Sequence, residues 1–252
     1  MKDLEGKVAI VTGCGQGVGK GIAIALAKEG ANIVAAGRTL SKVLKTADEI
    51  KSLGGKALAV ECDVTNFDDI KNTVSSTIKE YNRIDILINN AQLVPLGSVL
   101  EVTDSAFESG WNSGPLAVHR FMKLCYPHLK AVQGSIINLG TGAAIRPDPV
   151  GYGLYSAVKE AIRALSRAAA VEWGLDGIRV NTIIPIGNSP GMQMWEELVP
   201  EEANSFKESI PLARIGDCEM DIGKAVVSLV GPNMKYITGA TIPIDGGHSH
   251  LR

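Results

Sequence analysis

The sequence predicts a protein of the α/β class, in which helices cover both faces of a central parallel β-sheet. Short apolar segments rich in β-branched residues alternate with longer segments of helical composition, and such alternation indicates βαβ units. A glycine-rich stretch, residues 13–19, directly follows the first apolar segment. Hydrophobic residues make up 45% of the 252 residues and charged residues 21%, which is enough apolar material for a large core. Together these observations predict a Rossmann-like, doubly wound three-layer sandwich.

The expected elements follow one another in a regular order along the chain. Strands are expected at residues 7–12, 32–36, 57–62, 84–88, 135–139, 179–184 and 241–244. Helices are expected at residues 22–30, 40–53, 67–81, 104–130, 155–173 and 220–229. Because no linker rich in Pro or Ser divides the sequence, residues 1–252 are expected to form a single dinucleotide-binding and catalytic domain.

Charge, hydropathy and cysteine usage argue against several other classes of protein. The formal net charge is −2, which gives no electrostatic case for nucleic acid or an anionic membrane as partner. The first residues are charged and no apolar segment is long enough to cross a bilayer, so we expect a cytoplasmic protein. Neither the scattered cysteines nor the histidines have the spacing of metal ligands, and we expect reduced, buried thiols and no metal site.

The glycine-rich stretch has the composition of a phosphate-binding turn. Gly13, Gly15, Gly17 and Gly19 let the backbone turn tightly and approach a ligand without interference from a Cβ atom. The helix that follows presents unpaired N–H groups and the positive end of its dipole. Because the turn joins the first strand to the first helix, where doubly wound folds bind dinucleotides, we expect a cofactor here rather than a merely flexible loop.

Tyr155 and Lys159 lie four residues apart at the start of an expected helix. On a helix this spacing places both side chains on one face. A neighbouring cation favours the phenolate and lowers the pKa of a tyrosine, so the pair could perform acid–base chemistry. Because a lone Tyr-x-x-x-Lys is frequent by chance, this interpretation depends on the motifs around it.

Several motifs resemble those of the classical short-chain dehydrogenase/reductase family, and the resemblance covers nearly the whole chain. The glycine stretch, taken from Thr12, matches the family pattern Thr-Gly-x-x-x-Gly-x-Gly, and residues 155–159 match its catalytic Tyr-x-x-x-Lys. Residues 62–64, 89–91 and 242–247 are similar to its Asp-Val, Asn-Asn-Ala and closing Asp-Gly-Gly elements. The resemblance implies an oxidoreductase that interconverts a ketone or aldehyde and a secondary alcohol by hydride transfer, with Tyr155 as general acid and base.

The resemblance also implies which residues contact a nicotinamide cofactor, with Asp63 at the adenine ring and Lys159 on the ribose. These residues are Gly13, Gln16, Gly17, Val18, Arg38, Asp63, Val64, Asn89, Ala91, Tyr155, Lys159, Pro185, Ile186 and Ser189. It implies a small-molecule carbonyl or alcohol substrate, a lid at about residues 188–212, and a homotetramer or homodimer. The lid contains Met192, Met194 and Trp195, which could contact an apolar substrate or pack against the domain.

The end of the second strand discriminates between the two nicotinamide cofactors. An acidic residue there accepts hydrogen bonds from a ribose 2′-hydroxyl, whereas a 2′-phosphate requires neutral or cationic surroundings. Here Gly37 stands where NAD-preferring members place Asp, and Arg38 follows it. A guanidinium suits a phosphate through bidentate hydrogen bonds, so we expect NADP(H) in preference to NAD(H). The alternative for Arg38 is an exposed charge beside a helix.

The substrate half departs from the family pattern at four positions. The catalytic serine position holds Thr141, which retains a hydroxyl group but could also be a local capping residue. The asparagine position of a water relay falls on Gly114, which has no side chain, so only its backbone carbonyl could serve the relay. Pro115 beside it removes a backbone donor and indicates a break in the helix. Gln92 and Ile186 stand where the family has glycine.

Two functions are compatible with this pattern. The first is an NADP(H)-dependent alcohol dehydrogenase or carbonyl reductase that uses Tyr155, Lys159, Thr141 and Gly114. The alternative is a cofactor-binding protein of the same fold with little or no catalysis and a regulatory or scaffold role. The altered positions favour the alternative, whereas the intact Tyr155–Lys159 pair favours the enzyme. The identity of the substrate and the direction of the reaction stay open at this point.

Overall fold

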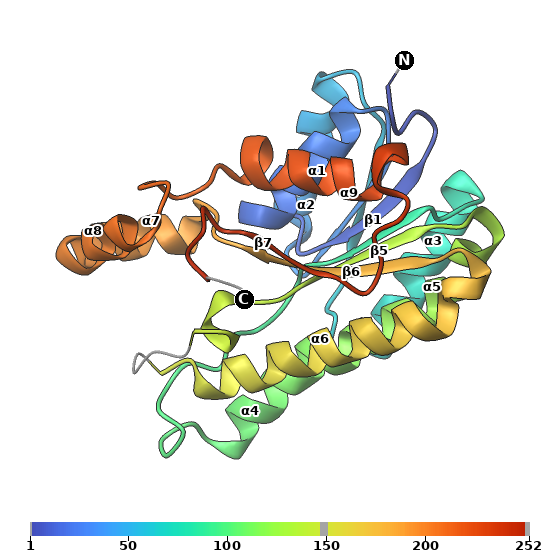
Figure 1. Cartoon of the computed structure of the whole chain (residues 1–252). Coiled ribbons are helices and arrows are strands. Elements are labelled where there is room, and N and C mark those ends of the chain that lie inside the picture. Colours follow the sequence, from blue (N-terminus) through green and yellow to red (C-terminus); the bar gives the residue numbers. More distant parts are fainter. Residues whose placement is uncertain (1, 147–150, 250–252) are drawn as a thin grey trace.

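A computed structural model describes residues 2–146 and 151–249 and has a central sheet of seven parallel strands (Figure 1). The strands are β1 (Val8–Thr12), β2 (Asn32–Gly37), β3 (Ala57–Glu61), β4 (Ile86–Asn89), β5 (Ser135–Leu139), β6 (Arg179–Pro185) and β7 (Thr241–Ile244). Their order across the sheet is β3-β2-β1-β4-β5-β6-β7. The chain therefore crosses from the β3 edge back to the centre after β3, and this reversal creates a crevice at the carboxyl ends of β1 and β4.

Helices cover both faces of the sheet. They are α1 (Gly17–Lys28), α2 (Leu40–Ser52), α3 (Phe67–Tyr81), α4 (Asp104–Trp111), α5 (Ala117–Val132), α6 (Gly153–Trp173), α7 (Pro190–Leu198), α8 (Pro200–Ser209) and α9 (Lys224–Val230). Buried side chains of α1, α2 and α9 pack on one face, and those of α3, α5 and α6 pack on the other (Figure 1). These two apolar layers confirm the doubly wound three-layer fold that the alternating pattern predicts. The central strands are buried along their length, which is why they read as continuous apolar runs.

Two segments differ from the regular helices expected for them. The expected helix over residues 104–130 is divided into α4 and α5 by one wide π-helical turn, η1 (Asn112–Leu116), which contains Pro115. Proline offers no backbone N–H and its ring obstructs a regular turn, so the helix widens at this point. The helix expected at residues 220–229 likewise begins as a π-helical turn, η4 (Cys218–Gly223), before α9.

Helix α1 packs closely against η4, the turn that precedes α9 on the same face of the sheet. A Cβ atom built on Gly21 would lie 2.3 Å from both the carbonyl carbon and the carbonyl oxygen of Cys218. Backbone atoms of η4 therefore occupy the space that any side chain at position 21 would need. This contact positions the amino end of α1, which follows the glycine-rich turn.

Candidate functional site

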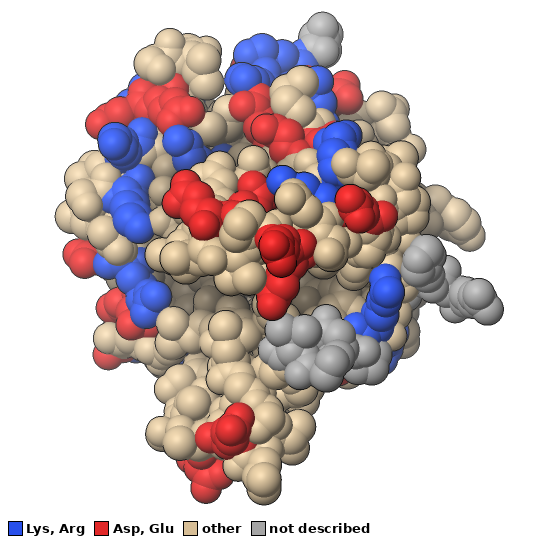
Figure 2. All heavy atoms as spheres, turned by 90° about the vertical axis from the view of Figure 1, so that its left-hand side faces the viewer, with Lys and Arg blue, Asp and Glu red and all other residues tan. Residues whose placement is uncertain are grey.

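A cavity of about 500 Å³ lies at the carboxyl ends of β1, β2 and β4, where the strand order reverses. Its size is in the range usual for small-molecule and cofactor sites. Many residues expected to contact a cofactor line it, namely Gly13, Gln16, Gly17, Val18, Arg38, Asp63, Val64, Ala91 and Ser189. Figure 2 shows this side of the molecule hollowed, with a lower lobe that carries acidic side chains and is otherwise uncharged.

The glycine-rich turn forms a backbone cradle at one end of the cavity. Gly13 and Gly17 have φ angles of +65° and +56°, a region in which residues with a Cβ atom are strained. The helix α1 begins at Gly17, and no described side chain caps it at Gln16. Its first N–H groups are thus available to an anionic ligand. The cradle and the uncapped helix fit a dinucleotide pyrophosphate.

Asn90 ties this cradle to the loop after β4. Its Nδ2 atom donates to the carbonyl oxygens of Thr12 and Gly13, at 2.9 Å and 3.2 Å. The hydroxyl oxygen of Thr12 in turn accepts from the backbone N–H groups of Asn90 and Ala91, both at 3.0 Å. A Cβ atom on Gly19 would lie 2.5 Å from Asn90 Nδ2. The glycine at 19 is therefore needed for the amide of Asn90 to reach the turn.

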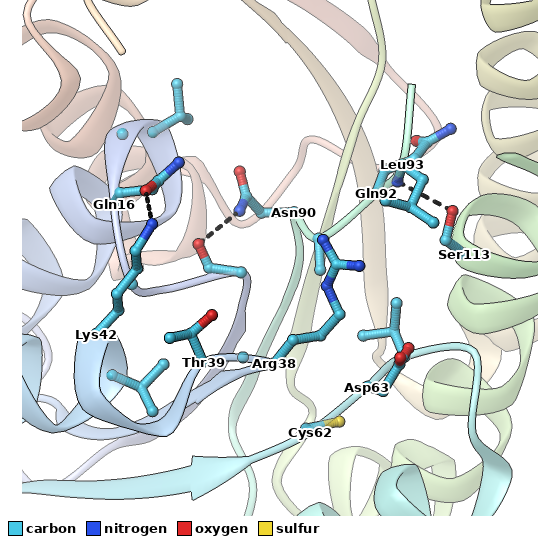
Figure 3. A pocket seen from close by; sticks show the side chains of 18 of the residues that line it. Gln16, Arg38, Thr39, Lys42, Cys62, Asp63, Asn90, Gln92, Leu93 and Ser113 are labelled. Carbon is cyan, nitrogen blue, oxygen red and sulfur yellow. Dashed lines mark hydrogen bonds between the residues drawn. The ribbon is translucent and has the colours of Figure 1, made fainter. Parts of the chain in front are cut away.

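Two cationic side chains line the cavity next to the glycine-rich turn. Arg38 is exposed and extends into the cavity from the end of β2, with Thr39 beside it (Figure 3). Lys42, one helical turn further along α2, donates from Nζ to Gln16 Oε1 at 2.7 Å. The sequence interpretation missed Lys42, although a basic residue one turn after Arg38 was a usable signal. Asp63 is the one acidic residue among the described residues that line the cavity.

Asp63 and Val64 lie on the loop after β3. The Oδ1 atom of Asp63 accepts from the backbone N–H and the hydroxyl of Thr65, at 2.9 Å and 2.8 Å. Val64 is largely buried, and it is one of the residues that line the cavity. The carboxylate of Asp63 is therefore fixed in place by its own loop and does not approach the two cations as a salt-bridge partner in any described contact.

Tyr155 and Thr141 meet beside this cavity. Thr141 follows β5, and its side chain hydrogen-bonds the Tyr155 hydroxyl. The Thr141 hydroxyl oxygen also accepts from the backbone N–H of Ala143 at 3.4 Å, so it caps the short helix η2 (Gly142–Ala144). The two interpretations of Thr141 that the sequence left open, a catalytic partner and a capping hydroxyl, are thus compatible with each other.

Lys159 lies under Tyr155 in the interior. Its side chain is 4% exposed, its Nζ donates to the carbonyl oxygen of Leu139 at 2.7 Å, and it lies 5.7 Å from the centre of the Tyr155 ring. Burial lowers the pKa of Lys159 to about 7. A lysine with this pKa is only partly charged at neutral pH.

The pKa of Tyr155 differs from the expectation drawn from its spacing to Lys159. The surrounding protein raises the pKa of Tyr155 to about 12, because desolvation outweighs the lowering effect of the hydrogen bond from Thr141, and Tyr152 adds to the rise. The lysine's charge does not overcome this desolvation, since burial has already lowered the lysine's own pKa. The phenol is therefore protonated at neutral pH in this structure.

Gly114 and Gln92 meet at the boundary between this pair and the cavity. Gly114 is buried in η1, and a Cβ atom built on it would lie 2.8 Å from Gln92 Nε2 and 2.8 Å from Val158 Cγ1. Val158 precedes Lys159 in α6. Gln92 also lines the cofactor cavity (Figure 3), so it connects that cavity with the start of α6.

Besides Tyr155 and Lys159, three expected cofactor residues lie outside the cavity lining. The side chain of Asn89 points into the sheet, where its Nδ2 donates to Asn138 Oδ1 at 2.7 Å. Pro185 ends β6, and Ile186 donates its backbone N–H to the carbonyl oxygen of Ile244 at 3.1 Å and lines a different cavity. Ser189 does line the main cavity, and its Oγ accepts from Met192 N at 3.3 Å as the cap of α7.

Exposed apolar side chains occur on two segments whose first residues line the cavity, the loop after β4 and α7. The exposed members on the loop after β4 are Val94, Leu96, Val99 and Leu100, and those on α7 are Met194 and Leu198. Trp195 packs edge-on against Phe206 of α8, with 5.6 Å between ring centres. Of the two roles considered for the lid side chains, Trp195 thus packs within the lid while Met194 faces outward.

The described residues contain no group of His, Cys, Asp and Glu side chains arranged to hold a metal ion. Their helices also include none that is both long and apolar enough to cross a membrane. The features that the site does offer are a glycine cradle, two cationic side chains in the cavity lining and a tyrosine–lysine pair outside that lining.

Comparisons with known proteins agree with this geometry. The family model described as enoyl-(acyl carrier protein) reductase matches residues 13–249. The chain is 43% identical over 255 residues to a 12alpha-hydroxysteroid dehydrogenase from a Clostridium species, covering 98% of each protein. A short chain dehydrogenase from Burkholderia cenocepacia in complex with NADP is 27% identical with a TM-score of 0.90, covering 99% of this chain and 100% of that one. A 7 alpha-hydroxysteroid dehydrogenase complexed with NADH and 7-oxo glycochenodeoxycholic acid is 28% identical with a TM-score of 0.91, covering 97% and 94%.

Proposed function

Because the chain belongs to the classical short-chain dehydrogenase/reductase family, we propose that it is an NADP(H)-dependent carbonyl reductase or alcohol dehydrogenase with Tyr155 as general acid and base. The family assignment carries the reaction class, hydride transfer between a nicotinamide cofactor and a carbonyl or secondary alcohol. The observation that supports the assignment of Tyr155 is its hydrogen bond with Thr141 above the buried Lys159. The hydroxyl of Thr141, the phenol of Tyr155 and the amine of Lys159 thus lie close to one another.

In the proposed reaction, the bound cofactor supplies the hydride that adds to the carbonyl carbon. Tyr155 donates its proton to the carbonyl oxygen, and the Thr141 hydroxyl beside the phenol orients it for this transfer. A pKa of about 12 keeps the Tyr155 proton in place until the substrate oxygen becomes basic. Because the pKa of Lys159 is about 7, its amine can gain or lose a proton at neutral pH. In the opposite direction the phenolate accepts the alcohol proton.

The proposal of NADP(H) over NAD(H) rests on the cationic end of the cavity. Gly37, Arg38, Thr39 and Lys42 line it without a carboxylate at the end of β2. Two cations and a hydroxyl suit a 2′-phosphate, and they offer no carboxylate to accept hydrogen bonds from the ribose 2′- and 3′-hydroxyls. The related structures contain either cofactor, so this preference depends on the residues of this chain alone.

For the substrate, we propose a large and rigid apolar alcohol or ketone of the hydroxysteroid type. Support comes from the 43% identity with the hydroxysteroid dehydrogenase. The loop after β4 and α7 also carry exposed apolar side chains, among them Leu96, Leu100 and Met194, and the first residues of both segments line the cavity. An apolar ring system would cover these side chains from water.

We also propose that residues 1–252 act as one catalytic domain in a cytoplasmic homotetramer or homodimer. Exposed apolar side chains on and beside α6, Val171 and Leu175, support an interface on that side. Sedimentation equilibrium of the purified chain measures the assembly directly.

A turnover assay separates the enzyme from a cofactor-binding protein that does no chemistry. Oxidation of NADPH is followed with a panel of steroid ketones and smaller ketones, for wild type and Tyr155→Phe. We expect the variant to lose about 100-fold or more in kcat, while NADPH binding measured by fluorescence stays unchanged. NADPH binding without any turnover that depends on Tyr155 would contradict the proposed enzyme and favour the regulatory alternative.

A further inference from the structure

Gln92 holds an unpaired carboxamide inside the site. Both its Nε2 and its Oε1 are buried from solvent, and within the described part of the chain neither atom has a hydrogen-bond partner. A primary amide has two N–H donors and an acceptor oxygen, and leaving such a group unpaired in the interior is unfavourable. Buried polar groups of this kind are uncommon in folded proteins and call for a specific explanation.

The amide fills the space of a side chain that Gly114 lacks. A Cβ atom on Gly114 would lie 2.8 Å from Gln92 Nε2 and 3.1 Å from Gln92 Cδ. These distances are too short for two unbonded atoms, so a side chain at position 114 and the present position of the Gln92 amide exclude each other. The amide that occupies this place thus comes from the loop after β4 instead of from η1.

The backbone on both sides of Gln92 is held in place. Asn90 is tied to the glycine-rich turn through Thr12 and Gly13. Leu93 donates its backbone N–H to Ser113 Oγ at 3.0 Å, on the residue that precedes Gly114 (Figure 3). A movement of the loop backbone that carried Gln92 towards solvent would therefore break contacts at both ends. Such a fixed and unpaired amide is suited to bind a ligand atom.

We propose that Gln92 is a positioning residue of the reaction, whose carboxamide binds a hydroxylic oxygen between the cofactor cavity and Lys159. Gln92 lines that cavity, and its Nε2 lies beside the same point of η1 that Val158, the neighbour of Lys159, contacts. The oxygen can belong to a water molecule in the proton path of Lys159 or to a second hydroxyl group of the substrate. This inference rests on the proposed oxidoreductase function and adds a residue to it.

Gln92→Met tests the proposal, because methionine has nearly the same shape and cannot form these hydrogen bonds. We expect kcat to fall about tenfold or more, while the NADPH dissociation constant measured by fluorescence changes less than about twofold. We expect the melting temperature to stay equal or to rise, because an unpaired buried amide is removed. A purely structural amide predicts the same thermal result with an unchanged kcat.

Ser135→Ala is the matched control. Ser135 Oγ is also buried without a described partner, but it lies at the start of β5, at the opposite end of the sheet from the site. Its removal is expected to raise or preserve the melting temperature and to leave kcat unchanged. Comparison of the two variants separates the general cost of an unpaired polar group from a role in turnover.

A swap of the amide between the two positions supplies a second test. Val158→Ala is carried in each variant, because Val158 Cγ1 also obstructs a side chain at position 114. Gln92→Ala with Val158→Ala is expected to be slow, and adding Gly114→Asn is expected to recover part of the lost kcat. A folded triple variant that is no faster than the double variant would contradict the proposal.

The choice of ketone identifies the source of the oxygen. If Gln92 binds a water molecule, Gln92→Met slows a ketone with a single oxygen and a ketone with further hydroxyl groups alike. If it binds the substrate, only the hydroxylated ketone is slowed. If the wild type turns over both ketones and Gln92→Met leaves both rates unchanged, the inference about Gln92 is wrong while the proposed function stands. Absence of turnover in the wild type overturns the proposed function.

Discussion

Lys159 donates a hydrogen bond from its Nζ atom to the carbonyl oxygen of Leu139 across 2.7 Å. Leu139 is the last residue of β5, so the lysine reaches past Tyr155 to the carboxyl end of a central strand. One carbonyl oxygen compensates only part of the lost hydration of an ammonium group. The lysine is therefore a costly residue for the fold, and this cost depends on pH.

The stability of the protein should rise with pH between about 7 and about 10 through Lys159. Its pKa is lowered from 10.5 in the unfolded chain to about 7 by burial, so in this window the unfolded state holds a proton that the folded state does not. Lys159→Met removes this titration. We expect the variant to be more stable than wild type by a few kcal/mol near pH 6, with a difference that shrinks towards pH 9.

Urea denaturation at several pH values measures this difference. Lys45→Met, on the exposed side of α2, is the control, and its difference from wild type should not vary with pH in the same way. A constant difference between Lys159→Met and wild type from pH 6 to 9 would show that the lysine is not titrating there.

The hydroxyl of Thr141 should matter more than its methyl group. Thr141→Val keeps the shape of the side chain and removes the hydrogen bond to Tyr155, which lowers the tyrosine's pKa. We expect kcat to fall about 10- to 100-fold and the pH profile to move to higher pH. Thr141→Ser retains the hydroxyl and should stay within about threefold of wild type. Equal activity of the Val and Ser variants would exclude a role for the hydroxyl group.

Replacement of Arg38 or Lys42 by an uncharged residue should weaken the binding of NADPH more than that of NADH. Arg38→Gln is expected to raise the Michaelis constant for NADPH about tenfold, because charge-assisted hydrogen bonds to a phosphate are lost, and to leave that for NADH nearly unchanged. Lys42→Gln should have a smaller effect of the same sign, since Lys42 is already bonded to Gln16.

Gly37→Asp should shift the preference towards NADH by placing a carboxylate at the end of β2. Lys45→Gln serves as the control for a change of charge nearby on α2. Parallel kinetics with both cofactors are the measurement. A wild type that prefers NADH, or an Arg38→Gln variant that weakens both cofactors equally, would refute the assignment to NADP(H).

Gly21→Ala should destabilise the fold by about 1–3 kcal/mol through overpacking. The added Cβ would meet the backbone of Cys218 at 2.3 Å, and backbone atoms cannot rotate away. Gly174→Ala is the matched control, because no atom lies within 4 Å of its Cβ position and its φ angle is −60°. That change should be neutral or stabilising by about 0.4–1 kcal/mol. Chemical denaturation of both variants compares them directly.

Much of the fold could be predicted from the sequence for a physical reason. Strands buried on both faces read as apolar runs, and the expected range 135–139 coincides with β5. The expected range 241–244 coincides with the partly buried edge strand β7. The glycine-rich turn could also be predicted from the sequence, because the positive φ angles at Gly13 and Gly17 favour glycine. Such features are local, and each is encoded by a few neighbouring residues.

Features that depend on contacts between distant segments could not be predicted in this way. Pro115 indicated a break in its helix but gave no sign that the break would be a π-helical turn. The raised pKa of Tyr155 depends on the desolvation of its surroundings, which the spacing to Lys159 does not contain. Gln92 and Gly114 appeared as two separate departures from the family pattern, and only the folded chain brings them together.

The shared space of Gln92 and Gly114 makes the two positions epistatic. A larger residue at 114 meets the Gln92 amide and Val158 at once, so a scan that changes one site at a time measures this crowding together with any chemical role of position 114. The same side chain can become acceptable once position 92 is shortened. Saturation libraries of this protein should therefore vary residues 92, 114 and 158 together, because the effect of each substitution depends on the other two.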